Sequence, residues 1–140
     1  MNFIVAFDGS SGAVAASEFI KKFLKEGDLV YGLYVVTDTT PPIKANLFEG
    51  TRTFNDVESF IYYLRDVFYA IFSGYNVKFS YTLSEKKPVS SIILDFAAKN
   101  NGDVVVTGTR KLKGLERIIM GSVSSAIISE SNIPVIVVPP

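Results

Sequence analysis

Residues 3–12 read FIVAFDGSSG, and this stretch decides the predicted fold. The apolar run from Phe3 to Phe7 is typical of a strand buried on both faces of a parallel sheet. Asp8 and Gly9 end the strand, and the two serines that follow can cap a helix. Apolar residues then recur at helical spacing as far as position 24, and Gly27 ends that helix. The chain therefore opens with a strand followed by a helix.

The same alternation continues to the end of the chain. Further strands are predicted at 29–36, 75–83, 103–107 and 133–138, and further helices at 56–74, 88–100 and 122–130. Strands that alternate with helices require crossover connections, which produce a parallel sheet covered on both faces. We therefore predict an α/β fold with one domain over residues 1–140, built on an open, Rossmann-like sheet of five parallel strands. The predicted strand order is 3-2-1-4-5, with helices on both faces.

One long segment does not follow this alternation. Residues 37–54 contain Pro41 and Pro42 and have no regular hydrophobic period. Proline removes a backbone donor, so we predict a long loop here, which serves as a lid or contact surface or is simply mobile.

Composition excludes several classes of chemistry. The 140 residues are 48% hydrophobic, enough for a single core, and 14 basic residues balance 14 acidic ones, unlike a typical nucleic-acid-binding domain. The chain has no cysteine and no histidine, which excludes thiolate nucleophiles, the Ser-His-Asp triad and zinc sites built from those residues. A metal site would use oxygen ligands, which suit Mg²⁺. No apolar run approaches ~20 residues and no signal peptide is evident, so we expect a cytoplasmic protein with no membrane partner.

Three segments are predicted to meet at one site. In the order 3-2-1-4-5, the first and fourth strands are neighbours, and ligands bind beyond their carboxyl ends. Residues 6–12 leave the first of these strands, residues 108–114 leave the other, and residues 121–124 open the last helix. We expect the binding crevice between them.

These segments contain groups suited to an anionic ligand. The unpaired N–H groups at the start of the last helix can bind an anion, although Ser122 can equally be a simple helix cap. Four basic residues lie close by in the sequence and favour the anion, namely Arg110, Lys111, Lys113 and Arg117. The carboxylate of Asp8 can accept a hydrogen bond from a base amine or a ribose hydroxyl, or can merely form a turn.

The segments FDGSS at 7–11, GTRKLKG at 108–114 and GSVS at 121–124 resemble the universal stress protein family. The resemblance covers the whole chain, including IPVIVVP at 133–139. The family's nucleotide-binding signature is a glycine, two residues, a glycine, nine residues, and a glycine followed by serine or threonine. Gly108 and Gly121-Ser122 match its first and last positions, whereas Lys111 stands where the middle glycine is expected.

The resemblance implies a dimeric domain of this fold that binds ATP when the signature is complete. It implies that Asp8 and the backbone around Val35 contact adenine, that Gly108 and Arg110 lie along the ribose and phosphates, and that Gly121, Ser122, Val123 and Ser124 hold the phosphates. Neighbouring residues complete the predicted binding set, namely Ala6, Phe7, Thr107, Lys111 and Gly114. Lys111 either obstructs the crevice, at a cost of roughly 1–2 kcal/mol if the backbone needs a positive φ, or offers its ammonium group to a phosphate.

We therefore expect a sensor or regulatory domain of the stress response that binds an adenine nucleotide, with ATP as the preferred ligand. A GxxxxGK[ST] loop is absent and no residue suited to activating water is evident, so fast phosphoryl transfer is not expected. The alternatives are a nucleotide-free interaction module and a slow, Mg²⁺-dependent ATP hydrolase. We also expect a homodimer joined through residues 133–138, because an apolar edge strand can pair with its own copy. Alternatively, Pro134 and the terminal prolines blunt that edge.

Overall fold

The expected alternation of strands and helices is present in the computed structural model, which describes residues 1–111 and 118–140. The elements are β1 (Asn2–Ala6), α1 (Ser11–Ile20), β2 (Leu29–Val36), β3 (Ile43–Leu47), β4 (Gly50–Phe54), α2 (Val57–Ile71), β5 (Val77–Leu83), α3 (Val89–Lys99), β6 (Val104–Gly108), β7 (Arg110–Lys111), β8 (Ile118–Ile119), α4 (Ser122–Glu130) and β9 (Val135–Val138).

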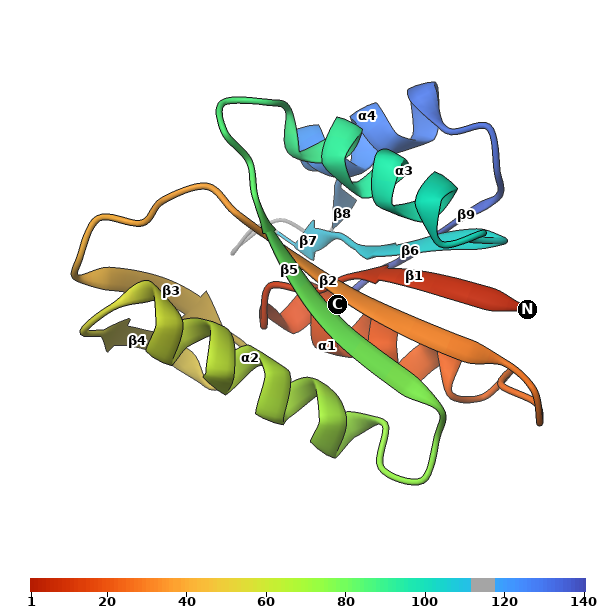
Figure 1. Cartoon of the computed structure of the whole chain (residues 1–140), viewed down its shortest axis with the longest axis horizontal. Coiled ribbons are helices and arrows are strands. Elements are labelled where there is room, and N and C mark those ends of the chain that lie inside the picture. Colours follow the sequence, from red (N-terminus) through yellow and green to blue (C-terminus); the bar gives the residue numbers. More distant parts are fainter. Residues whose placement is uncertain (112–117) are drawn as a thin grey trace.

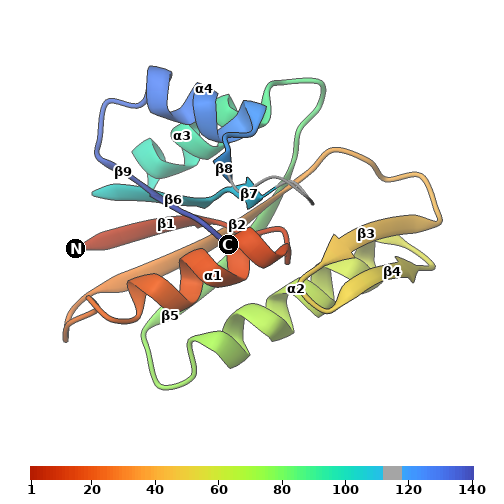
Figure 2. The ribbon, with the colours of Figure 1, turned by 180° about the vertical axis from the view of Figure 1, so that it is seen from behind.

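The main sheet has five parallel strands in the order β5-β2-β1-β6-β9, which confirms the predicted order. Helices α1 and α2 lie below the sheet in Figure 1, and α3 and α4 lie above it. The view from behind shows the same two layers (Figure 2). Strand β1 pairs with β2 on one side and with β6 on the other, so the loops that follow β1 and β6 leave the sheet next to each other.

Two apolar cores result from the alternation of side chains along the strands. Val5 and Phe7 face α1 and α2, whereas Ile4 faces α3 and α4. Phe68 of α2 is completely buried in the first core, with its ring 5.2 Å from the ring of Phe7. Because both faces of the sheet are covered, its central strands consist of continuous apolar runs.

The prediction of a long irregular loop over residues 37–54 is wrong. This segment contains an antiparallel hairpin in which β3 pairs with β4, from Ile43 opposite Phe54 to Leu47 opposite Gly50. Alternate residues of β3 are buried and exposed, as in a strand with one face on a core. This alternation lasts only five residues and follows two prolines directly, so its period is weak in the sequence. The prolines precede the hairpin rather than interrupting it.

The hairpin is attached to the loop that follows β1. The backbone N–H of Phe48, in the hairpin turn, donates to the carbonyl oxygen of Gly9 at 2.8 Å. Tyr63 of α2 donates its hydroxyl to Glu49 at 2.8 Å, and the Arg52 guanidinium lies 5.0 Å from the centre of the Tyr63 ring. The hairpin therefore connects α2 with the carboxyl end of the sheet.

Helix α1 is shorter than predicted, because it ends at Ile20 rather than near Gly27. Beyond it the chain makes two tighter bonds, from Lys22 N–H to the Phe19 carbonyl at 3.2 Å and from Phe23 N–H to the Ile20 carbonyl at 2.9 Å. Bonds of this i to i+3 type preserve the spacing of apolar residues for another turn, which explains why the periodicity extends past the helix.

Helix α2 begins where predicted. The carboxylate of Asp56 accepts a hydrogen bond from the backbone N–H of Ser59 at 2.7 Å and caps the helix. This backbone hydrogen bond is the main cause of a lowered pKa for Asp56, because it stabilises the charged form. Among the described residues α2 is the longest helix, at 15 residues, and none of their helices is long and apolar enough to span a membrane.

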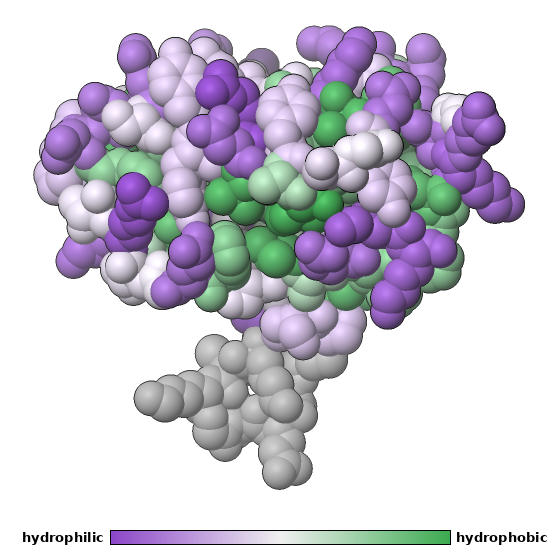
Figure 3. Space-filling model, turned by 90° about the horizontal axis from the view of Figure 1, so that it is seen from below, coloured by the Kyte–Doolittle hydropathy of each residue, from purple (hydrophilic) through white to green (hydrophobic). Residues whose placement is uncertain are grey.

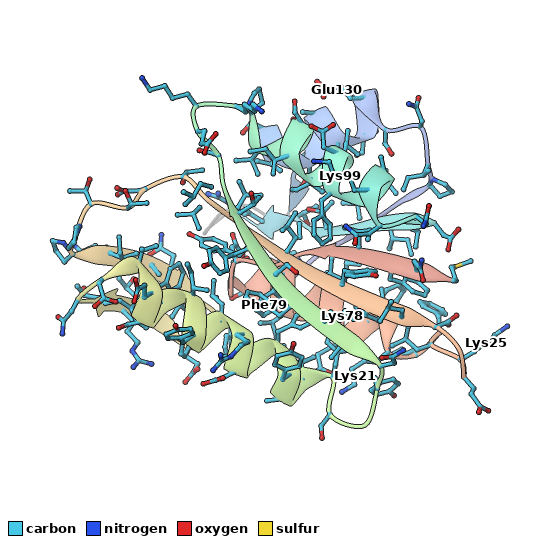
Figure 4. All side chains as sticks on the ribbon, in the orientation of Figure 1. Lys21, Lys25, Lys78, Phe79, Lys99 and Glu130 are labelled. Atoms are coloured by element: carbon cyan, nitrogen blue, oxygen red, sulfur yellow. The ribbon has the colours of Figure 1, made fainter. Side chains whose placement is uncertain are left out.

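The two edges of the sheet differ. Strand β5 forms one edge of the sheet, as the predicted order 3-2-1-4-5 requires. The Phe79 backbone N–H there donates to the Tyr69 hydroxyl oxygen at 3.2 Å, so a side chain of α2 covers part of that edge. Figure 4 labels Phe79 on this strand. On the other edge, β9 has three half-buried residues followed by the buried Val138.

Candidate functional site

The carboxyl ends of β1 and β6 bring the first two predicted segments together. Val5 is paired with Val106 at the end of the ladder between these strands. Asp8 follows Val5 by three residues, and Gly108 follows Val106 by two. The loops after β1 and β6 therefore start side by side, as the predicted strand order requires.

Asp8 is exposed and forms the turn that leads into α1. Its Oδ1 accepts a hydrogen bond from the Ser10 N–H at 3.0 Å, and Ser10 in turn caps α1 by accepting from the Ala13 N–H at 3.2 Å. Among the described residues, no hydrogen bond reaches the other carboxylate oxygen of Asp8. The turn-forming role is therefore present, and one oxygen is still able to accept a hydrogen bond from a ligand.

The other predicted residues near Asp8 divide between the two faces of the sheet. Phe7 is 1% exposed and its side chain belongs to the core beneath α1 and α2. Ala6 and the buried Val35 pack on the opposite side, with the α3 and α4 residues. Phe7 can thus contribute only backbone to a ligand, whereas Ala6 and Val35 lie on the face that also holds the predicted phosphate segment.

Gly108 makes one of the tightest contacts in the molecule. A Cβ atom at this position would lie 2.2 Å from the carbonyl carbon of Gly12 in the first turn of α1. In the same way, a Cβ on Gly12 would lie 2.4 Å from the Thr109 carbonyl oxygen. The backbones of α1 and β6 therefore touch without a side chain between them, and packing alone requires glycine at Gly108.

The residues beside Gly108 have buried hydroxyl groups. Thr107 and Ser124 are each 5% exposed, and their Oγ atoms lie 3.2 Å apart. Ser124 also donates to the Gly108 carbonyl oxygen at 3.1 Å. The backbone N–H of Thr109 donates to the Val138 carbonyl at 3.0 Å, so this residue turns toward β9. The two contacts of Ser124 attach the first turn of α4 to the end of β6, and the Thr109 bond joins that end to β9.

The start of α4 is open. Gly121 is the N-cap, with extended backbone, and a Cβ added to it would have no atom of the described residues within 4 Å. No side chain among those residues caps the helix, and Ser122 is exposed, whereas Val123 packs against the core on that side. The first N–H groups of a helix lack partners within it and carry partial positive charge. The arrangement therefore fits an anionic group placed close to Gly121.

The basic segment is only partly described. Arg110 is exposed, and β7 pairs with β8 through Arg110 opposite Ile119 and Lys111 opposite Ile118. Lys111 lies in a strand, and strand backbone has negative φ. The backbone at this position therefore does not need glycine, and lysine fits there without strain from a positive φ. Lys113, Gly114 and Arg117, which the sequence also singled out, lie outside the described residues.

Sequence reasoning missed Tyr34, which lies one residue before Val35 on β2. Its ring packs 5.3 Å from the ring of Phe60. Burial, together with the negative charges of Asp8 and Asp38, raises the pKa of Tyr34 to about 12. The phenol is therefore a neutral hydrogen-bonding group near Asp8 at ordinary pH. Its position at the carboxyl end of a predicted strand was the available signal.

Comparison with known proteins identifies relatives across the whole chain. A model of the universal stress protein family matches residues 1–139. The universal stress protein MJ0531 of Methanocaldococcus jannaschii is 30% identical over 148 residues, which cover 96% of this chain and 79% of that protein.

Two solved structures share the fold. A universal stress protein family protein of Arabidopsis thaliana, solved with AMP bound, has a TM-score of 0.64 at 16% identity, with 99% of this chain and 91% of that chain covered. The universal stress protein of Archaeoglobus fulgidus in complex with dAMP has a TM-score of 0.61 at 19% identity, with 98% and 96% covered. At these identities the likeness establishes the architecture.

Proposed function

Because the chain belongs to the universal stress protein family, we propose that it binds an adenine nucleotide, preferably ATP, between the carboxyl ends of β1 and β6. The observation that carries this proposal is the N-terminus of α4, where Gly121 leaves space beside N–H groups that no side chain of residues 1–111 or 118–140 caps. The AMP and dAMP bound by two proteins of the same fold support the choice of an adenine nucleotide. The domain would then act as a sensor or regulator in a stress response.

Each part of the nucleotide would have a matching group. The remaining carboxylate oxygen of Asp8 and the backbone around Val35 would accept and donate hydrogen bonds to the base or ribose. The N–H groups of residues 122–124 and the Ser122 hydroxyl would bind the phosphates, because a helix N-terminus favours negative charge. The exposed Arg110 would add a cation on the open side of the crevice.

Calorimetry with ATP at millimolar concentration tests the proposal. The wild-type protein should release or absorb heat and gain thermal stability. Asp8→Ala should weaken binding by about tenfold or more, since a hydrogen bond to a charged group contributes roughly 1.5–3 kcal/mol. Gly121→Val should weaken it by filling the space beside the phosphates. Asp95→Ala, which removes an exposed carboxylate from α3, is the matched control and should bind normally. If the wild type gave no heat and no thermal shift with ATP, nucleotide binding would be excluded.

Lys111 decides between the nucleotide-binding domain and the nucleotide-free alternative. We propose that its ammonium group is attracted to the phosphates, so Lys111→Gly should lower ATP affinity, or leave it unchanged if solvent screens the charge. A clear increase in affinity would mean that the lysine obstructs the crevice. Lys25→Gly provides the control, because Lys25 is exposed and lies at the opposite end of the molecule from the strand carboxyl ends (Figure 4).

We also propose a homodimer joined through β9. A pair of four-residue strands is too short to bury about 800 Å² per partner, the usual size of a stable interface, so apolar surface beside it must contribute. A groove of about 350 Å³ lies between α1 and the end of β9, lined by Ala15, Phe19, Lys22, Val137, Val138 and Pro139. Figure 3 shows green, apolar surface on the side of the molecule where α1 lies.

Light scattering at micromolar concentration should give twice 15.4 kDa for this dimer. Lysines at both Val135 and Val137 should lower the mass toward that of the monomer, because their charges would be buried in the strand pair. Lysines at Tyr81 and Leu83, exposed on the opposite sheet edge, are the matched control and should leave the dimer intact. A wild-type protein that is monomeric at every accessible concentration would contradict the proposal.

A further inference from the structure

The contact between α4 and β6 is made by two hydroxyl groups that solvent hardly reaches. Thr107 lies in β6 and Ser124 in the first turn of α4, and each residue is 5% exposed. Their Oγ atoms are 3.2 Å apart, and the Ser124 Oγ is 3.1 Å from the carbonyl oxygen of Gly108. Ser122, two residues before Ser124, is by contrast exposed.

The number of protons limits how these bonds can be arranged. A serine or threonine hydroxyl has one proton to donate and lone pairs that accept. The carbonyl oxygen of Gly108 can only accept, and it lies 3.1 Å from the Ser124 Oγ and 3.4 Å from the Thr107 Oγ1. In one arrangement Thr107 donates to Ser124 and Ser124 donates to Gly108, and in the other Ser124 donates to Thr107 and Thr107 donates to Gly108. Both arrangements use the single Ser124 proton inside this group of Thr107, Ser124 and the Gly108 carbonyl, which we call the hydroxyl chain.

This use of its proton limits what Ser124 can do for a ligand. Phosphate oxygens at neutral pH are acceptors and require donors. The one donor of Ser124 is already used inside the protein, whereas the exposed Ser122 hydroxyl and the unpaired N–H groups of the first turn can be offered to a ligand. The Ser124 hydroxyl therefore has no proton left to donate to a phosphate, although the Ser124 backbone N–H is still able to donate.

We propose that Ser124, together with Thr107, is a positioning residue that aims the N-terminus of α4 at the anionic part of the ligand. This inference rests on the proposed nucleotide binding. Within the part of the chain that the structure describes, no side chain caps the first turn of α4, and the hydroxyl chain is a polar attachment that holds this turn against β6. Since the field of a helix end falls off within about one turn, its strength at the ligand depends on that alignment.

The test compares ATP with adenosine, which lacks phosphates. Ser124→Ala and Thr107→Val each break the chain, and each should lower the ratio of ATP affinity to adenosine affinity by about tenfold, within the range of helix-end interactions. The double variant should lose no more than either single variant, because both act through one chain. Ser124→Thr, which keeps the hydroxyl, should restore the wild-type ratio.

Two results would overturn the positioning role. If Ser124 itself bound phosphate, Ser124→Ala would lower the ratio while Thr107→Val left it at the wild-type value. If neither substitution changed the ratio, the hydroxyl chain would have no part in binding. Ser125→Ala, an exposed position in the same turn, is the control for simple loss of a serine and should match the wild type.

Amide hydrogen exchange without ligand separates this inference from the proposed function. The Ser125 N–H donates to the Gly121 carbonyl at 3.0 Å and reports on the first turn of α4. Its exchange should be about tenfold faster in Ser124→Ala and Thr107→Val but not in Ser122→Ala. Faster exchange supports the attachment even if the wild type binds no nucleotide. Unchanged exchange would refute it even if the wild type binds ATP.

Discussion

Replacing Gly108 by alanine tests the contact between α1 and β6 most directly. The added methyl group would lie 2.2 Å from the Gly12 carbonyl carbon and 2.3 Å from its oxygen. Carbon atoms in contact are normally about 3.5–4.0 Å apart, so the helix and the strand would have to separate by more than about 1 Å. Both colliding groups are backbone, and no side chain can rotate away to make room.

The expected loss of stability follows from two opposing effects. Overpacking typically costs about 1–3 kcal/mol, and the upper end applies because only backbone can move. Replacing glycine also restricts the unfolded chain, which stabilises the folded state by about 0.4–1 kcal/mol. The steric effect is larger, so we expect a net loss of about 2 kcal/mol or more. That is a large part of the roughly 5–15 kcal/mol that stabilises a typical domain.

Urea unfolding followed by circular dichroism measures this loss. With a typical dependence of about 1–3 kcal/mol per molar urea, the midpoint for Gly108→Ala should fall by about 1 M or more. Gly121→Ala is the matched control, because that position has φ −72° and an added Cβ there has no atom of residues 1–111 or 118–140 within 4 Å. The free energy of unfolding of this variant should stay within about 1 kcal/mol of the wild type. If both variants unfolded at the wild-type midpoint, the close contact between α1 and β6 would not exist in solution.

Three further substitutions test other parts of the structure. Tyr69→Phe removes the acceptor for the Phe79 N–H and should increase self-association through the β5 edge in sedimentation experiments, whereas Tyr62→Phe, at another exposed tyrosine of α2, should not. The pKa of Asp56 is lowered in the folded state, so its contribution to stability is present at neutral pH and is lost as the pH falls below about 4 through that lowered value. Asp56→Asn can still cap α2 but does not titrate. Its urea midpoint should therefore change less between pH 7 and pH 3 than that of the wild type. Phe68→Ala should lower the free energy of unfolding by about 3–5 kcal/mol, because it empties the centre of a core; a loss under about 1 kcal/mol in urea unfolding would contradict the packing described.

Much of the fold was predictable because its signals are local. Strands β1, β2, β6 and β9 are short apolar runs, β5 alternates apolar and polar residues, and a strand-helix alternation limits the possible strand orders. The position of Asp8 and Gly121 at one end of the sheet followed from that order. The β3–β4 hairpin was missed because the alternation that marks it is short and the two prolines before it favour a loop.

The individual roles in the site depended on contacts that no local pattern contains. Gly108 and Gly12 are distant in the sequence, so the contact between their backbones could not be read from either segment. Ser122 and Ser124 have the same side chain and lie two positions apart, yet one is exposed and the other buried. Which of them can donate to a ligand depends on how α4 packs on β6, and that is a property of tertiary structure.

The contact between Gly108 and Gly12 also changes how the three-glycine signature should be used to classify related chains. A relative that never binds a nucleotide still needs glycine at the first position, as long as α1 crosses β6 at the same distance. Packing by the described residues makes no such demand at Gly121, where an added Cβ meets none of their atoms. We therefore expect the last glycine to discriminate between binding and non-binding chains better than the first, and a pattern that weights the two equally to select some proteins that have only kept their fold.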